Sequence, residues 1–211
     1  AYPEEPAIYN LLGVVEAQEG HYRAAESRFA KALTLAPHYE GAYENLGRLY
    51  QEQARNDPQA LDKAVETYRR LLKVNPESLE AKYQLATVLS RKGEFSASLQ
   101  YLRLIPAGHL ERPQALSLLC ANYLGAGERE KAKEVTQRLG ESPDLTELDV
   151  TAILPVFSQH KAQDFATQLL AALHRRRLAS PDALLQLGVM YGQQDKLSEA
   201  REILLRAAES K

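Results

Sequence analysis

Five histidines are the first residues to test for chemistry, because an imidazole can ligate a metal ion or transfer a proton near neutral pH. They lie far apart in the sequence, at His21, His38, His109, His160 and His174. None belongs to a His-Glu-x-x-His motif, and no two have the spacing of paired metal ligands. Most fall at turns or helix ends in the hydrophobic pattern. We therefore expect no metal site and no catalytic histidine.

The single cysteine and the one glycine-rich segment also lack the context that catalysis requires. Cys120 has no second cysteine with which to form an internal disulfide. The segment LGAGE, residues 124–128, lacks the Lys-Ser/Thr end of a phosphate-binding loop and is interpreted as a turn between helices. Since no other pattern indicates a nucleophile, we expect no enzyme activity and no cofactor.

The strongest charge run is HRRR, which contains Arg175, Arg176 and Arg177. It falls near the end of a predicted helix, where cations suit the negative end of the helix dipole. The alternative is a patch for an anionic partner. Nucleic-acid binding is not expected, because the formal net charge is −2 and the predicted inner faces carry no repeated basic set.

The elements that position these residues belong to an ordinary globular composition, with 211 residues, 45% hydrophobic and 26% charged. No apolar run approaches the ~18 residues of a membrane span, and no signal peptide is visible. We expect a soluble chain, either cytoplasmic or periplasmic. Because it begins with Ala1, we also expect it to be part of a longer parent protein.

A Leu-Gly pattern recurs along the chain and indicates internal repeats. The step from Gly13 to Gly47 is 34 residues, and Gly188 repeats the same surroundings near the C-terminus. A second marker, a small residue, keeps the same register in all six units at Ala25, Ala64, Ser98, Ala132, Ala166 and Ala200. Each unit is typical of two amphipathic helices joined by a turn. Cys120 shares the register position of Gly13 and is therefore interpreted as a small buried packing residue.

The pattern resembles the tetratricopeptide repeat (TPR) family over nearly the whole chain, with no specific member identified. Unit one supplies Tyr9, Leu12, Gly13, Gly20, Tyr22, Ala25, Phe29, Ala32 and Pro37. It departs from the family at Glu16, where Tyr is usual. The resemblance implies an all-α fold, a right-handed α-α superhelix of about twelve antiparallel helices.

The register predicts one solenoid domain, 1–211, because a single helix pair cannot bury its apolar face alone. Its units are approximately 6–39, 40–78, 79–112, 113–146, 147–180 and 181–211, with unit 147–180 degenerate.

Three places depart from the repeat. An insertion near Asp57-Pro58 predicts a lengthened first helix and a longer loop in unit two. Pro106 is expected to end the second helix of unit three early. In unit five, Leu154 replaces the small residue, and Pro155 is expected to kink or break the first helix.

The resemblance implies that the first helix of each unit lines a concave face that binds a partner peptide or helix. Projecting the register gives Asn10, Val14, Glu44, Asn45, Arg48, Tyr83, Gln84, Thr87 and Arg91 as partner-binding candidates. The same projection adds Leu11, Gln18, Glu52, Ser117, Leu118, Ala121, Leu185, Gln186, Val189 and Gln193. Asn45 and Arg48 are expected to face away from the packing stripe. An amide at Asn45 can both donate to and accept from a peptide main chain, although a plain surface residue is the alternative.

One subtype of the family binds chaperone C-terminal tails through two Lys, two Asn and one Arg. The matching places are Asn10, Val14, Asn45, Glu80 and Gln84, of which only Asn45 agrees. The cations are absent and Glu80 would repel a carboxylate, so binding of such tails is not expected.

Three functions stay open. The first is a non-catalytic scaffold that holds a protein partner in the concave groove. The second is self-association through the terminal repeats, because Leu204 and Leu205 have no following helix to cover them. The third is an accessory, substrate-recruiting module of an enzyme whose catalytic domain lies outside the chain.

Overall fold

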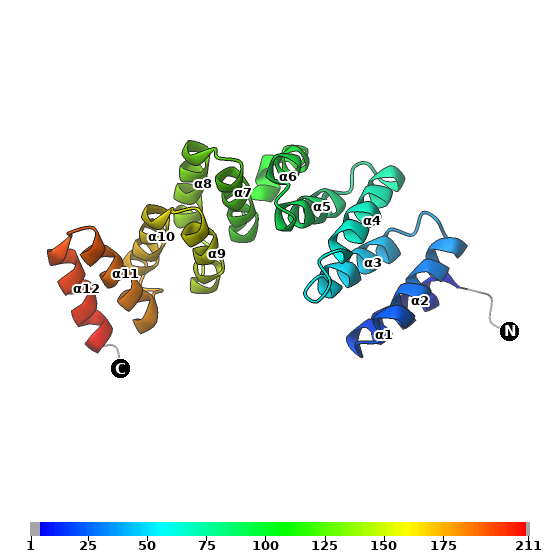
Figure 1. Ribbon diagram of the computed structural model, residues 1–211, viewed down its shortest axis with the longest axis horizontal. Coiled ribbons are helices and arrows are strands. Elements are labelled where there is room, and N and C mark those ends of the chain that lie inside the picture. Colours follow the sequence, from blue (N-terminus) through cyan, green and yellow to red (C-terminus); the bar gives the residue numbers. More distant parts are fainter. Residues whose placement is uncertain (1–4, 210–211) are drawn as a thin grey trace. The chain divides into compact units, whose positions relative to one another are not determined.

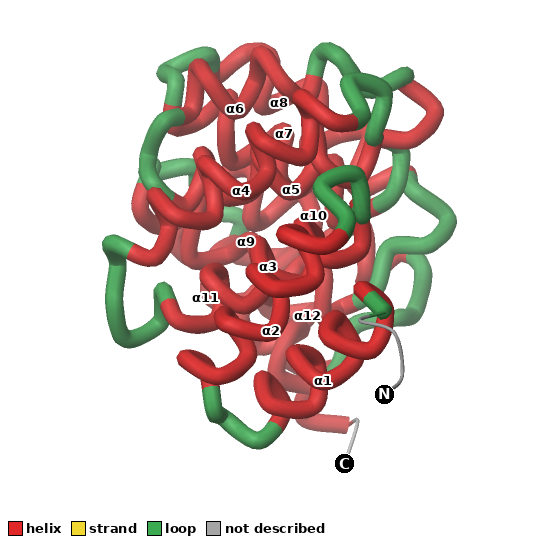
Figure 2. The backbone as a smooth tube through the Cα atoms, turned by 90° about the vertical axis from the view of Figure 1, so that its right-hand side faces the viewer, coloured by secondary structure: helices red, strands yellow, loops and turns green. Residues whose placement is uncertain are grey.

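The structure is a computed structural model that describes residues 5–209, which fold into α-helices joined by turns and one 3₁₀ helix (Figure 1). No strand occurs in this range, as the tube trace also shows (Figure 2). The all-α helical-repeat architecture is therefore confirmed.

The chain divides into two compact units, Ala1–Ile105 and Pro106–Lys211. The helices of the first are α1 (Pro6–Gln18), α2 (Tyr22–Leu35), α3 (Glu40–Gln53), α4 (Ala60–Val74), α5 (Leu79–Arg91) and α6 (Phe95–Leu102). The second begins with the 3₁₀ helix η1 (Ala107–Leu110) and continues with α7 (Pro113–Gly125), α8 (Arg129–Glu141), α9 (Glu147–Gln159), α10 (Gln163–Arg175), α11 (Pro181–Gln193) and α12 (Leu197–Glu209). Consecutive helices pair as hairpins, one hairpin in each predicted repeat (Figure 1).

A small residue on the first helix of every hairpin except α9–α10, where the place holds Leu154, lets the second helix approach closely. A Cβ added at Gly47 would lie 2.4 Å from Cζ of Tyr68, and one added at Gly13 would lie 2.7 Å from Phe29. In α7 the same place holds Cys120, whose Sγ lies 3.2 Å from Thr136 Oγ1. Cysteine is larger than the glycine of α1 and α3, and it faces Thr136, which is smaller than Phe29 and Tyr68. Burial raises the pKa of the Cys120 thiol to about 11, which suits a packing residue.

The turn in five of the six hairpins, all except α3–α4, has a left-handed backbone at one position. Gly20, Gly93 and Gly127 occupy it with φ of 79°, 78° and 77°. The corresponding residues of the last two hairpins are Lys161 and Asp195, with φ of 52° and 58°. Two non-glycine residues therefore adopt a conformation that costs L-residues energy.

The insertion near Asp57 and the proline at position 106 affect the lengths of a loop and of two helices. The insertion lies mostly in the loop 54–59, where Asp57 Oδ1 accepts from the Gln59 backbone N–H at 3.0 Å. Helix α3 has 14 residues against 13 in α1, so the expected lengthening amounts to one residue. Helix α6 ends at Leu102, before Pro106, as expected.

The expected break at Pro155 does not occur, since α9 is continuous from Glu147 to Gln159. Pro155 lies on the exposed side of the helix, while Val150 and Phe157 pack into the core. A capping box at the N-terminus, in which Thr146 and Asp149 bond each other's backbone N–H, also holds the helix.

Candidate functional site

A groove of about 220 Å³ lies between α1 and α3, with α2 at its base. Its lining consists of Val14, Ala17, Gln18, Phe29, Asn45, Arg48, Leu49 and Glu52. Five of these were projected from the repeat register onto the inner face, among them Val14, Asn45 and Arg48. Register reasoning missed Ala17, Phe29 and Leu49, since it assigned Phe29 to packing and gave Ala17 and Leu49 no role. Phe29 and Leu49 pack between the helices and give the groove an apolar floor.

Two asparagines from successive first helices bond each other beside this groove. The Asn45 Nδ2 group donates to Asn10 Oδ1 at 2.9 Å, and Asn10 Nδ2 donates to the Tyr39 hydroxyl at 3.4 Å. Asn10 is buried. The sequence predicts that Asn10 faces the groove. In the structure Asn10 is instead buried, and its side chain holds the Asn45 amide in place. Asn45 keeps its Oδ1 available as an acceptor.

The groove lining contains one cation, Arg48, and one carboxylate, Glu52, and a further carboxylate, Glu44, lies next to Arg48. Arg48 Nη2 lies 3.9 Å from Glu44 Oε2, and the Arg48 side chain is largely exposed. Burial raises the pKa of the Glu44 carboxyl, and the nearby Glu80 charge raises it further, while Arg48 lowers it. Negative charge at Glu44 is thus unfavourable here, and a bound cation would relieve it.

A second amide contact connects α3 with α5. The Gln51 Nε2 group donates to Gln84 Oε1 at 3.0 Å and to the Tyr68 hydroxyl at 2.9 Å. Gln84 Nε2 donates to Glu80 Oε1 at 3.0 Å. Gln84 is thus held by its neighbours and does not line the groove. No sequence pattern singled out Gln51, because its role depends on which side chains of α5 come beside α3.

The remaining candidates on α5 also lie outside the groove lining. Thr87 Oγ1 donates to the Tyr83 carbonyl at 2.9 Å, and Tyr83 is half-buried. Burial and the Glu80 charge raise the pKa of the Tyr83 hydroxyl. Arg91 Nη1 donates to the Gln51 carbonyl at 3.2 Å, near the end of α3. These three residues extend the polar surface beyond the groove.

The structure divides the arginine run near the end of α10 into separate roles. Arg176 Nη1 donates to the Ser142 carbonyl at 2.7 Å, and its Nη2 donates to the Pro143 carbonyl at 2.6 Å. Arg176 therefore binds carbonyls just after α8, while an anion-binding patch at Arg175, Arg176 and Arg177 stays a prediction. Arg177 lines a separate pocket of about 390 Å³, to which His174 also contributes.

The described part of the chain, residues 5–209, holds no group of three or more His, Cys, Asp or Glu side chains placed to bind a metal ion. None of its helices combines the length and apolar character that a bilayer crossing requires.

Comparison with known proteins gives matches at both ends of the chain and in its middle. Family models described as "Tetratricopeptide repeat" match residues 6–39, 59–109 and 182–211. A curated relative is the tetratricopeptide repeat and J domain-containing co-chaperone DNJ1 of Cryptococcus neoformans var. grubii, which is 28% identical over 102 residues. The match covers 46% of this chain, but the chain spans only 18% of that relative.

Solved structures share the fold at low sequence identity. A tetratricopeptide repeat protein from Parabacteroides merdae superposes with a TM-score of 0.69 at 17% identity, covering 100% of this chain and 80% of that one. YrrB, described as a TPR protein with an unusual peptide-binding site, gives a TM-score of 0.56 at 17% identity, covering 87% of this chain and 92% of that one. The helix hairpins, their shared register and these matches together show that the chain belongs to the tetratricopeptide repeat family.

Proposed function

We propose that the chain is a non-catalytic scaffold that holds an extended peptide segment of a protein partner in the groove between α1 and α3. The observation that carries this proposal is the groove's composition, an apolar floor at Phe29 and Leu49 with a polar rim at Asn45, Arg48 and Glu52. Proteins of this family and fold are generally non-catalytic. A groove of about 220 Å³ has room for a few side chains, which favours an extended peptide over a helix.

The Asn45 amide suits recognition of a peptide main chain. Its Oδ1 can accept a peptide N–H, and the bond from its Nδ2 to Asn10 already holds the side chain in one orientation. A side chain that is ordered before binding loses less entropy when the peptide arrives. The peptide-binding site of YrrB, a protein of the same fold, supports this kind of function by analogy.

The charges beside the groove favour one kind of peptide. Burial raises the pKa of the Glu44 carboxyl and the Glu80 charge raises it further, so a terminal carboxylate near Glu44 would add another unfavourable negative charge. A lysine or arginine side chain would instead stabilise both carboxylates. We therefore propose an internal peptide segment that carries a basic residue, and not a free C-terminal tail.

A display library of random dodecapeptides tests this function directly. Peptides enriched on the wild-type chain are resynthesised, and their affinity is measured by fluorescence anisotropy. Val14→Arg should fill the groove without removing any hydrogen bond described above, and we expect at least a tenfold loss of affinity, or ~1.4 kcal/mol. Ala24→Arg, at an exposed position of α2 outside the lining, is the matched control and should bind normally. Failure to enrich any peptide, or equal binding by Val14→Arg, would rule out the groove.

A second candidate function is self-association through the C-terminal repeat. The observation in its favour is that Leu204 and Leu205 on α12 are exposed, at 37% and 53%. Exposed apolar clusters of this kind indicate an interaction surface.

A further inference from the structure

A pocket of about 390 Å³ lies where α10, α11 and α12 meet, in the compact unit that does not contain the groove. Its lining, here called the basic pocket, consists of His174, Arg177, Ala179, Leu184, Arg206 and Glu209. Among the described residues, α8 and α9 also pack against α10 but contribute nothing to this lining. Two guanidinium groups and an imidazole therefore face one carboxylate.

Two basic side chains of the pocket contact each other directly. Arg206 Nη1 lies 3.3 Å from His174 Nε2. A guanidinium carries only donors, so the Nε2 atom must accept, and the imidazole must be neutral with its proton on Nδ1. Protonation of His174 would turn this hydrogen bond into a repulsive contact between two cations.

The charges around His174 oppose its protonation. Burial lowers the pKa of the imidazole, and the Arg206 charge on α12 and the Arg175 charge on its own helix lower it as well. Glu202 on α12 raises this pKa, but Glu202 Oε1 also lies 3.2 Å from Arg206 Nη2. An anion in the pocket would stabilise the clustered cations and would favour the charged imidazole.

The turn after α10 separates the roles of two neighbouring arginines. Arg176 bonds the carbonyls of Ser142 and Pro143 and so holds the fold. Arg177 has a left-handed backbone with φ of 58°, and its N–H donates to the His174 carbonyl at 2.9 Å. This conformation turns the chain back at the end of α10, and the Arg177 side chain lines the basic pocket.

The chemistry of the lining matches a phosphorylated side chain. A phosphoryl group carries a charge of about −1.5 to −2 near neutral pH and three strong acceptor oxygens, enough for two guanidinium groups and an imidazole. Leu184 and Ala179 give the pocket an apolar part that the carbon stem of such a side chain can contact. A nucleic acid would bring a run of phosphates toward Glu202 and Glu209 on a chain of formal net charge −2, which disfavours it.

We propose that the basic pocket binds a phosphorylated side chain of a protein partner, with Arg177 and Arg206 donating to its oxygens and His174 adding a third donor when protonated. This site goes beyond the groove function and does not depend on it. Binding and protonation should assist each other. A phosphoryl group that raises the pKa of His174 is itself bound more tightly, by the same factor, once His174 is protonated.

NMR titration of the histidine side chains measures this coupling in the intact chain. The probe is a blocked, otherwise uncharged pentapeptide with phosphoserine at its centre, and the range is about pH 5 to pH 8. We expect the saturating peptide to raise the pKa of His174 by about one unit. In the free chain the neutral imidazole should carry its proton on Nδ1. A His174 pKa that does not move when the peptide is added would overturn the proposal.

Related probes separate a phosphorylated side chain from other anions. The phosphoserine peptide is compared by calorimetry with the same peptide carrying serine or glutamate and with inorganic phosphate. We expect it to bind about tenfold more tightly than the glutamate peptide. It should also bind more tightly than inorganic phosphate, because its stem contacts Leu184 and Ala179. Equal affinity for inorganic phosphate would overturn the assignment to a protein side chain.

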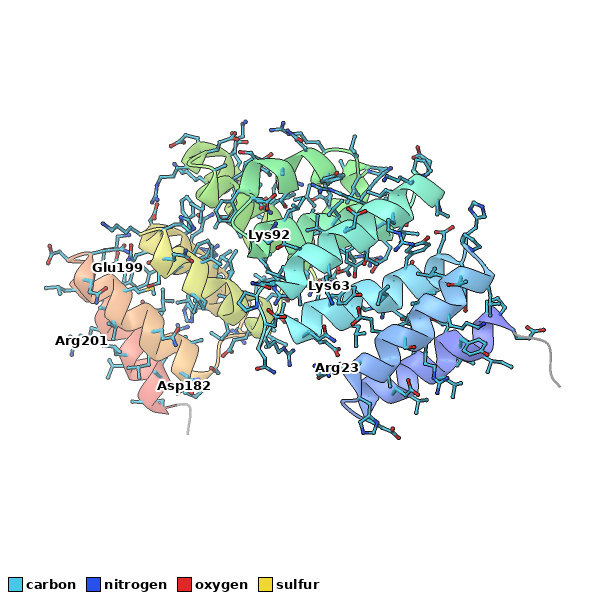
Figure 3. The ribbon with its side chains drawn as sticks, turned by 45° about the vertical axis from the view of Figure 1, so that its right-hand side comes forward. Arg23, Lys63, Lys92, Asp182, Glu199 and Arg201 are labelled. Atoms are coloured by element: carbon cyan, nitrogen blue, oxygen red, sulfur yellow. The ribbon has the colours of Figure 1, made fainter. Side chains whose placement is uncertain are left out.

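Two arginine variants with the same change of net charge test the location. Arg177→Gln alters the lining, whereas Arg201→Gln alters an exposed position of α12 outside it, labelled in Figure 3. Only Arg177→Gln should weaken the phosphoserine peptide, by about tenfold. Equal losses in both variants would show general attraction between charges and would overturn the proposal. Circular dichroism checks that both variants fold.

Two further variants separate this site from the groove and from a structural role of the histidine. Val14→Arg should bind the phosphoserine peptide normally, because the groove lies in the other compact unit. His174→Gln should match wild type at about pH 8, where the imidazole is neutral, and bind several-fold more weakly than wild type at about pH 6. A His174→Gln chain that follows wild type at both pH values would overturn the role given to His174.

Discussion

The close approach of Gly47 to Tyr68 shows how a single residue sets the distance between α3 and α4. Gly41 lies in the same helix but has space, since an added Cβ would only meet the far end of the Tyr39 side chain at 3.4 Å. Packing against Tyr68 therefore requires glycine at position 47, whereas the space around position 41 would admit a larger residue. Substituting each with alanine separates packing from helix propensity.

We expect Gly47→Ala to lower the free energy of unfolding by about 1–3 kcal/mol, because the new methyl overlaps the Tyr68 ring. Gly41→Ala should raise it by roughly 0.5 kcal/mol, because alanine favours the helix and restricts the unfolded chain. Urea unfolding followed by circular dichroism measures both. Changes of the same sign in the two variants would contradict this explanation.

Glu44 gives the groove a dependence on pH. Its folded-state pKa is raised by burial and by Glu80, so the protonated form fits the fold better. Stability from this site is therefore fully present below the unfolded pKa and is lost as the pH rises through the folded pKa. We expect Glu44→Gln to be more stable than wild type at neutral pH by roughly 0.5 kcal/mol, since the site is partly exposed and screened.

The stability difference between Glu44→Gln and wild type should vanish below the unfolded pKa, at roughly pH 3, where Glu44 is neutral in both the folded and the unfolded chain. Urea midpoints at the two pH values measure it. Glu66→Gln, at an exposed position of α4, serves as the control and should follow wild type throughout. A Glu44→Gln chain that is less stable at neutral pH would show that the Arg48 contact outweighs burial.

At the level of elements, the hairpin turns of the last two repeats differ from those of earlier repeats at one backbone position. Lys161 and Asp195 hold the left-handed turn position that Gly20, Gly93 and Gly127 hold earlier. We expect Lys161→Gly to raise the free energy of unfolding by about 0.5–1 kcal/mol, because glycine reaches this conformation without steric cost. The reciprocal change, Gly127→Lys, should lower it by a similar amount. Thermal unfolding of the two variants decides between this account and one in which the turn is neutral.

The helices and their register could be predicted from the sequence, because small and large residues recur at a fixed step. The continuity of α9 could not, since it depends on Pro155 facing outward and on the Thr146–Asp149 cap. For the site, projection named Val14, Asn45 and Arg48, which line the groove, and their binding of a partner stays a prediction. The burial of Asn10 was missed because its partner, Tyr39, precedes α3 and belongs to no repeat marker. The bonds of Arg176 were missed for a similar reason, since its carbonyl partners follow α8.

For the whole molecule, the two compact units set how the chain should unfold. Repeat proteins derive their stability from each repeat and its nearest neighbours, so a local change has a local effect. Leu139→Ala, at a fully buried position of α8, should cost about 2–5 kcal/mol. We expect amide hydrogen exchange to speed up in the helices of Pro106–Lys211 and to stay unchanged in α1–α4. Equal acceleration along the entire chain would show one cooperative unit.

The amide pair between Asn10 and Asn45 also bears on fidelity during folding. A stack of similar hairpins invites errors, because a hairpin from a neighbouring molecule can insert where a native one belongs. An intruding α1 at the first junction would place Leu11 against Asn10 and bury an amide without its partner. Conversely, α3 on the last hairpin would place Asn45 against Leu185. The first junction thus disfavours an α1 from another copy, which should steer newly made chains away from domain-swapped products.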